Sequence, residues 1–485
     1  MANFVPLKGF LPDLDPTIPG IILECNGFLP SKMGLRSAFS AANYGYDALA
    51  AACKGFTVAR KTDGTTRVIA GTESKLYEIS GTSWVDRTRA SGGDYTTSTG
   101  KWRFGQFGNI TYAVNKLDTP QYSSSGAFAD HPEMPKCAIV ETANQFVLIG
   151  NTNDATYGDQ TDRWWCSAIG DPDDFTTSVA TQCVTARLTD VPGAITAIRG
   201  LDEQVAFFKQ RGLYVATYQG PPTVWGFRLV SQDVGTFCQE SAVKVGSVIY
   251  FMGYEDFYLF DGTVPRPIGD GIREWFFNEQ LSRDVADKTW GFFDRYNMII
   301  YWFYASVDGS GTVDKWIAYR PTTGTWGAGT LTVEAAGEFL TASPTYDSFG
   351  LGLTYDTLPD VVYDSSYWGT TAPAPAVFTS SHILSTLDGA SGTGTLKTGW
   401  VGDDQDYSTV RRVIPRWKDE PTSATLVHTY VTSLGGTEAS NSSTSMEEGR
   451  FDVMQSGRWH QDEVTTVGTC DLGGFAYDTS GSGQE

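Results

Sequence analysis

An internal repeat of strand-forming segments most constrains what this chain can fold into. Residues 204–221 align with residues 248–265 at a spacing of 44, and each copy has an apolar strand, a short polar turn and a second, aromatic-rich strand. Two β-rich runs this close together are typical of an antiparallel hairpin. A third copy, at 67–80, aligns Leu76-Tyr77 with Leu213-Tyr214 and Phe257-Tyr258. A period of roughly 40–50 residues with several short strands indicates a β-propeller.

Looser copies of the same hairpin can be placed between and after these three. The hairpins begin near residues 68, 110, 146, 205, 249 and 298, and their spacing varies because loops accept insertions at little cost. We therefore predict a propeller within residues 41–349, with six blades, or seven if residues 349–364 form another hairpin. The three aromatic pairs should occupy equivalent positions in different blades.

The composition agrees with an all-β fold. Charged residues make up 19% of the chain against a usual value of about 25%, aromatic residues make up 13%, and 53 glycines and 21 prolines supply turns. One apolar face at 271–288 predicts a single helix between blades. The stretch Ala372–Pro375 suggests a domain boundary. We predict that residues 350–485 form a smaller all-β unit, which could also lend a strand to close the propeller.

Residues 1–40 differ from the repeats. They are rich in proline and lack periodicity, and proline removes a donor from any sheet ladder. We predict an extended N-terminal arm that contacts a partner or a neighbouring subunit. Deleting it should leave the thermal midpoint of the monomer nearly unchanged.

No residue is predicted to be catalytic, cofactor-binding or metal-ligating. The four histidines, at 131, 382, 428 and 460, stand singly, and no nucleophile elbow, phosphate loop or zinc motif is present. Acidic clusters could bind calcium or hydrolyse glycosides, but their spacing favours solvated turns. Two tryptophans that follow second hairpin strands could be carbohydrate platforms, although packing on a neighbouring blade is the better interpretation. The acidic clusters are Asp13/Asp15, Asp171/Asp173/Asp174 and Asp403/Asp404/Asp406, and the tryptophans are Trp84 and Trp326.

Net charge limits the partners. The formal net charge is −21, and no run of Lys or Arg is longer than two, which argues against a protein that binds nucleic acid tightly through its phosphates.

Seven scattered cysteines without a CxxC pair are expected to be buried apolar residues. Neither a signal peptide nor a membrane-spanning segment is expected, so synthesis in the cytosol is predicted.

Several stretches together resemble the tail nozzle proteins of short-tailed bacteriophages, also called tail accessory or packaged-DNA-stabilisation proteins. The stretches are the opening LPDLDPTIPGIILECNGFLPSKMGLR, the blade segments LYEISGTSW and FYLFDGTVP, the turn WCSAIGDPDDF and the closing SGRWHQDEVTTVG. The resemblance implies a structural, non-enzymatic β-propeller subunit of the virion tail, made in the bacterial host cytoplasm. It also implies assembly as a six-fold ring below the portal and head-to-tail adaptor, which extends the channel for double-stranded DNA without sequence-specific binding, supports tail fibres or a needle, and retains the packaged genome.

A carbohydrate-binding or glycan-cleaving propeller is the alternative. The tryptophans and Asp-rich turns favour it, whereas the arm and the missing S-x-D-x-G-x-T-W boxes of sialidase-type propellers count against it. The mass of the purified particle would separate the two, since a ring favours the nozzle and a glycan-binding monomer favours the alternative.

Overall fold

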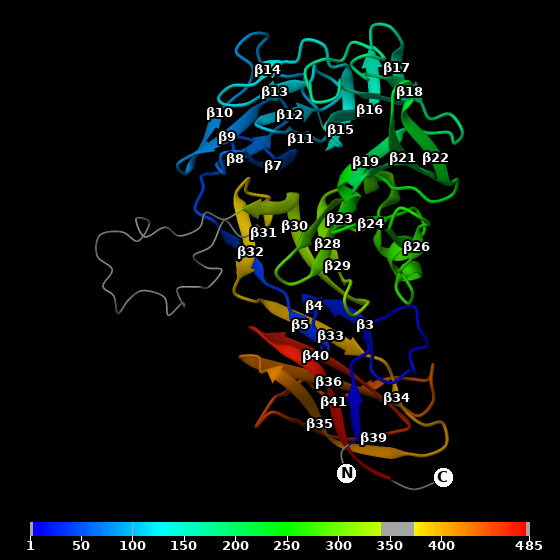
Figure 1. Ribbon diagram of the computed structural model, residues 1–485. Coiled ribbons are helices and arrows are strands. Elements are labelled where there is room, and N and C mark those ends of the chain that lie inside the picture. Colours follow the sequence, from blue (N-terminus) through cyan, green and yellow to red (C-terminus); the bar gives the residue numbers. More distant parts are fainter. Residues whose placement is uncertain (1–2, 99, 341–372, 482–485) are drawn as a thin grey trace.

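Five successive four-stranded antiparallel sheets dominate the first two thirds of the chain. The computed structural model describes residues 3–98, 100–340 and 373–481 (Figure 1). In each sheet the strands pair in chain order. The first two sheets are β7 (Gly55–Arg60), β8 (Thr66–Gly71), β9 (Leu76–Ser80) and β10 (Ser83–Asp86), and β11 (Arg103–Phe107), β12 (Ile110–Val114), β13 (Gln121–Ser123) and β14 (Ala129–Asp130). The third is β15 (Lys136–Ala143), β16 (Phe146–Asp154), β17 (Gly158–Cys166) and β18 (Thr185–Arg187). The fourth and fifth are β19 (Ile195–Leu201), β20 (Gln204–Lys209), β21 (Gly212–Gly220) and β22 (Val224–Ser231), and β23 (Ala242–Val245), β24 (Val248–Met252), β25 (Phe257–Phe260) and β26 (Arg266–Pro267).

A sixth set of four strands follows within a larger sheet. It comprises β27 (Trp290–Asp294), β28 (Ile299–Ala305), β29 (Val313–Arg320) and the long β30 (Thr325–Leu340), paired in order. The first strand of each set contacts the first strand of the next, from β7 through β11, β15, β19 and β23 to β27, and β30 contacts β7. The sets therefore close into a β-propeller, seen as the upper part of Figure 1.

The repeat predicted from the sequence is confirmed. All three aromatic pairs lie at the start of the third strand of their sheets, where Leu76, Leu213 and Phe257 face Gly71, Phe208 and Met252 of the second strand. The first member of each pair is fully buried. Each of the six predicted hairpins begins at or beside the second strand of its set, β8, β12, β16, β20, β24 or β28. The hairpin considered at 349–364 lies outside the described residues, so the blade number stays a prediction.

The C-terminal strands belong to two sheets, one of which is the larger sheet that contains the sixth set. One extends β30 through β31 (Pro373–Thr379) and β32 (Leu384–Gly389), and also contains β35 (Ser408–Asp419), β39 (Phe451–Gly457) and β41 (Asp471–Gly481). The other is built on β33 (Thr393–Thr398), β40 (Trp459–Val467) and β36 (Ser423–Val431), with the short β34 (Val401–Gly402), β37 (Ala439–Ser440) and β38 (Thr444–Ser445). Since β31 and β32 continue the sixth propeller set, the two parts share one sheet.

The N-terminal segment is extended, but it is built into these sheets. Its strands are β1 (Asn3–Pro6), β2 (Gly9–Phe10), β3 (Ile21–Asn26), β4 (Phe28–Pro30), β5 (Leu35–Ser37) and β6 (Ser40–Asn43). β1 and β5 pair with β41, β3 with β33, β4 with β30 and β6 with β32. In Figure 1 the blue N-terminal strands lie among the orange and red C-terminal ones. The expectation that prolines keep residues 1–40 out of sheet ladders is therefore corrected, because much of this segment is paired, and Pro6 and Pro30 themselves end the strands β1 and β4.

The predicted helix at 271–288 is two short turns. A π-helix, η2 (Trp275–Gln280), is followed by a 3₁₀ segment, η3 (Arg283–Lys288), and the chain is extended at Leu281 between them. Another short 3₁₀ turn, η1 (Gln239–Ser241), precedes the fifth sheet. Phe276 and Phe277 of η2 pack on Phe257, which joins η2 to the main core.

Candidate functional site

Polar side chains from several sheets meet η1 at the inner strands of the propeller. Arg103 of β11 donates to Glu240 over 2.7 Å and to the carbonyl of Ala138 over 2.9 Å. Lys101 donates to Glu240 over 3.2 Å and to the carbonyl of Thr289 over 2.6 Å. The Glu240 carboxylate therefore joins the turn before the fifth sheet to Lys101 and Arg103 at the second sheet. Arg103 also bonds to the third sheet, and Lys101 to the residue before the sixth set.

Burial and charge act in opposite directions on Glu240. Burial raises the pKa of this carboxyl, but the cations Arg103 and Lys101 outweigh burial, so the pKa lies well below its usual range. The three side chains are mostly buried, with exposed fractions of 12%, 17% and 10%. A buried carboxylate held by two cations is stable only while all three groups are present. The cluster is a structural lock between blades.

Beside this lock lies a pocket of about 290 Å³, lined mainly by inner strands. Arg199 of β19 donates to Glu141 of β15 over 3.1 Å, and to the carbonyls of Gln239 and Ala242 over 2.7 and 2.9 Å. Burial raises the pKa of Glu141, and Arg199 partly offsets this effect. Arg199 thus connects its own strand, β19, to β15, to η1 and to β23. This volume is at the lower end of small-molecule sites and far too small for a nucleic-acid duplex.

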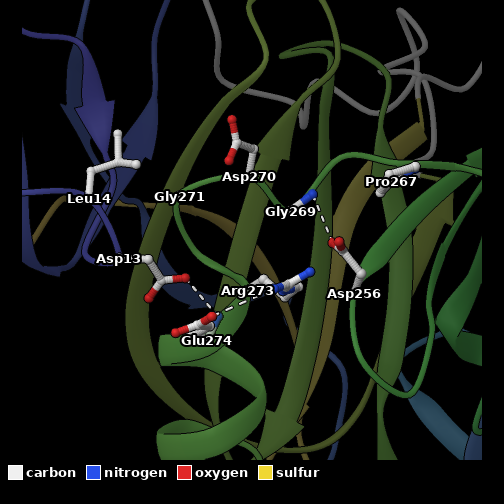
Figure 2. A pocket seen from close by; sticks show the side chains of 9 residues that line it. All are labelled: Asp13, Leu14, Asp256, Pro267, Gly269, Asp270, Gly271, Arg273 and Glu274. Carbon is white, nitrogen blue, oxygen red and sulfur yellow. Dashed lines mark hydrogen bonds and ion pairs between the residues drawn. The ribbon is translucent and has the colours of Figure 1, made fainter.

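A second pocket, of about 450 Å³, lies between the N-terminal segment and residues 267–274, which lead into η2 (Figure 2). Asp13 accepts hydrogen bonds from the backbone N–H groups of Glu274 and Trp275 over 2.7 and 2.8 Å. It therefore satisfies two donors at the start of η2 that have no partner within the helix. Across the pocket Asp256 accepts from the N–H of Gly269 over 2.9 Å. The carboxylates that line this pocket thus fasten the N-terminal segment and the fifth blade.

The other acidic clusters form turns, as the sequence predicts. Asp15 accepts from the N–H and hydroxyl of Thr17. Asp171 accepts from the N–H of Asp173, and Asp174 from that of Thr176. In the third cluster the acceptor pairs are Asp403 with the N–H of Gln405 and Asp404 with the indole N–H of Trp459. The described residues contain no group of three or more His, Cys, Asp or Glu side chains that could hold a metal ion.

Both tryptophans considered as carbohydrate platforms pack against other aromatic side chains. Trp326 is 1% exposed and lies with Phe257 and Tyr319 at centroid distances of 4.7 and 4.5 Å. Trp84 is half-buried against Phe378 of β31, and its indole N–H donates to the carbonyl of Asp47 over 2.9 Å. The packing interpretation therefore holds for both.

Sequence reasoning missed a buried histidine pair in the C-terminal unit. Nε2 of His428 lies 3.0 Å from Nδ1 of His460, and Nδ1 of His428 lies 2.7 Å from Asp462. Nε2 of His460 lies 3.0 Å from the hydroxyl oxygen and 3.2 Å from the carbonyl oxygen of Ser408. A row of polar contacts therefore runs from Asp462 through both rings to Ser408. His460 and Asp462 are two residues apart, so they lie on the same face of β40, which the sequence could have indicated. The pairing of β36 with β40, which places His428 beside them, was not visible in the sequence.

Cysteine placement follows the prediction. All seven cysteines are free, and six are buried. Burial raises the pKa of the Cys25 thiol to about 12 and that of Cys166 to about 11, so these thiols stay protonated at neutral pH. None of the helices in the described ranges is long and apolar enough to span a membrane.

Comparison with known proteins identifies no family. No protein-family model and no curated protein matches the chain. Among solved structures, the extracellular domain of a one-component system from B. thetaiotaomicron is 11% identical at a TM-score of 0.40, with 72% of this chain and 40% of that chain covered. YCF48 from Cyanidioschyzon merolae is 8% identical at 0.34, covering 60% and 88%. An exo-β-1,3-galactanase from Phanerochaete chrysosporium is 10% identical at 0.30, covering 91% and 100%. These scores are low, so the fold assignment rests on the sheet topology.

Proposed function

We propose that this chain is a structural virion protein that forms the tail nozzle ring of a short-tailed bacteriophage. In this role it has no catalytic activity, assembles as a six-fold ring below the portal and adaptor, supports tail fibres or a needle, and retains the packaged DNA. The proposal starts from the resemblance of several sequence stretches to tail nozzle proteins. It also agrees with the contacts of Glu240, Arg103, Lys101 and Arg199, which connect blades to one another.

One structural observation supports the proposal most. The two stretches at opposite ends of the chain that carry the resemblance, 11–36 and 456–468, enter the same sheet. β3 from the first stretch pairs with β33, and β33 pairs with β40 from the second. Two segments more than 400 residues apart that resemble one family therefore belong to one structural unit, as expected if the resemblance reflects a shared fold and not chance composition.

The geometry of the propeller limits where a DNA channel can run. The inner strands are joined by Glu240, Arg103, Lys101 and Arg199, and the pocket beside them has a volume of about 290 Å³. A duplex cannot pass along the axis of one propeller. In the proposed ring the channel is therefore enclosed between copies of the chain, each propeller forming one sector of the wall.

The mass of the purified protein tests this proposal. A ring of six 52.8-kDa chains has a mass of about 317 kDa, which native mass spectrometry and sedimentation velocity both resolve from a monomer. We expect the purified chain to form the ring by itself or when tail adaptor complexes are added. Electron microscopy should then show a central channel. A chain that stays monomeric with adaptor complexes present would contradict the proposal.

A further inference from the structure

The outer face of one C-terminal sheet presents apolar side chains and cations together. Four of its strands lie side by side in the order β1, β41, β35 and β39, at the lower end of Figure 1. One face of these strands covers the main core, to which Val413 and Phe475 belong. Alternate residues therefore face away from the core. They include Phe4 and Ile414, which lie on either side of Ala476, the residue after Phe475.

The apolar part of this face is open to solvent. Phe4 is 52% exposed, although its ring lies against β41, where a Cβ atom on Gly474 would stand 2.8 Å from it. Met454 of β39 follows the buried Val453 and is 67% exposed. Ile414, in the strand between them, is half-buried. Single exposed apolar residues are common, but three on neighbouring strands of one sheet indicate an interaction surface, where Phe and Met are enriched.

Cations surround these apolar residues. β35 has one acidic residue and four exposed cations, which are Arg411, Arg412, Arg416 and Lys418. Arg412 and Lys418 each pair with a carboxylate, over 2.9 and 3.4 Å. Within the described ranges, Arg411 and Arg416 form no side-chain hydrogen bond or ion pair. The excess of cations on β35 is the reverse of the whole chain, which has 35 basic and 56 acidic residues. We call the surface of Phe4, Arg411, Ile414, Arg416 and Met454 the basic face.

Charge determines which partner the basic face can take. Two arginines without a carboxylate partner favour an acidic surface. A second copy of this chain offers such a surface, because its net charge is −21. Contact of the basic face with itself across a two-fold axis would bring four unpaired arginines together, so like charges oppose it. The favoured contact is therefore heterologous, between the basic face of one copy and a different, acidic face of the next, and contacts of this kind generate rings.

We propose that the basic face is one side of the contact between neighbouring copies, and that it docks on an acidic surface of a second copy of this chain. The inference rests on the proposed ring and adds which face forms its contacts. Phe4 and Ile414 supply the apolar centre of the contact, and Arg411 and Arg416 supply the charges that select and orient the partner. Since β1 carries Phe4, the N-terminal segment takes part in the contact.

Sedimentation velocity of the full chain over a range of concentrations tests the proposal, with tail adaptor complexes added if the ring needs them. Arg411→Glu combined with Arg416→Glu reverses both charges, and the two Gln substitutions only remove them. Phe4→Ala removes the exposed ring. The matched control combines Arg60→Glu with Arg211→Glu, because both of these arginines are exposed but lie on the propeller, at the end of β7 and between β20 and β21. Thermal midpoints of the double variants check that each still folds.

We expect the concentration at which half of the chains are assembled to rise by about ten-fold or more in the charge-reversed variant. The Gln variant and Phe4→Ala should each raise it by a smaller factor, and the control should leave it unchanged. Thermal midpoints of the double variants should match that of the unmodified chain, since the altered side chains are exposed.

A ring that survives charge reversal would overturn this inference and leave the proposed ring standing. Duplex DNA retained by the unmodified ring but not by the charge-reversed one would then assign the basic face to nucleic acid. Equal weakening by the control would also overturn the inference, because the effect would follow net charge and not this face. A chain that stays monomeric with adaptor complexes present would contradict both the ring and the contact.

Discussion

His428 and His460 share a hydrogen bond of 3.0 Å between their rings in the interior of the C-terminal unit, where both side chains are buried. Burial, followed by the neighbouring His428, lowers the pKa of His460 to about 4 from the 6.5 of a free histidine. His460 is therefore neutral in the folded protein at pH values where an exposed histidine is charged.

This pair predicts loss of stability in mild acid. Between pH 6.5 and about 4 the unfolded chain binds a proton at His460 that the folded chain does not, so the free energy of unfolding falls as the pH falls. The contribution of neutral His460 to the free energy of unfolding is complete above pH 6.5. Below that pH, this free energy falls by at most about 1.4 kcal/mol per pH unit. Thermal midpoints measured from pH 7.5 to 4.5 should show a shallower decline for His460→Gln than for the unmodified chain. Equal declines would mean that other groups determine acid sensitivity.

Glu240→Ala should destabilise the propeller strongly. The substitution leaves Arg103 and Lys101 as buried cations without their carboxylate, and breaking such a cluster costs about 3–5 kcal/mol. Because the pKa of Glu240 is lowered, its contribution is present above the usual carboxyl pKa of 4.5 and is lost as the pH falls through the lowered value. Urea unfolding at pH 7 measures the effect. Glu255→Ala, at a side chain 72% exposed, is the control and should change little.

Phe257→Ala tests the repeated position in the third strand. The ring is fully buried and lies 4.7–5.2 Å from those of Phe276, Phe277, Trp302 and Trp326. Removing it should lower the free energy of unfolding by about 3–5 kcal/mol. Val264→Ala, at a side chain 61% exposed, should remain within about 0.5 kcal/mol of the unmodified chain in the same urea titration.

The N-terminal segment should be required for stability, which reverses the expectation from sequence. Ile22 of β3 is fully buried in the main core, so Ile22→Ala should cost about 2–5 kcal/mol. Glu24→Ala changes a side chain of the same strand that is 71% exposed, and it should have little effect. Differential scanning calorimetry compares the two. A thermal midpoint unchanged by Ile22→Ala would restore the interpretation of a detachable arm.

Assembled rings should bind duplex DNA weakly. Each chain has a formal net charge of −21, and we predict that the channel surface is net negative, so that the phosphate backbone meets no deep binding minimum as it moves. Electrophoretic mobility shifts with purified rings at low salt should show little retained DNA. Tight binding at low salt, or a channel lined by Lys and Arg in the assembled structure, would refute this prediction.

Local pattern was sufficient for the repeat. The residues of each hairpin are close in sequence, so the alignment of Leu76, Leu213 and Phe257 is enough to place three third strands. The same local reasoning identified the Asp-rich turns, because an Asx turn depends on residues two or three positions apart.

Tertiary structure decided what depends on distant pairing. Asp13 caps η2 from more than 250 residues away in the sequence. β3 pairs with β33, although all the propeller strands lie between them along the chain. Neither contact leaves a local trace, since a proline-rich segment with short apolar runs has the same appearance whether it is free or paired. His428 and His460 come together only through the register of β36 and β40. The sequence by itself therefore determined the repeating sheets, whereas only the fold brought its ends and its polar groups together.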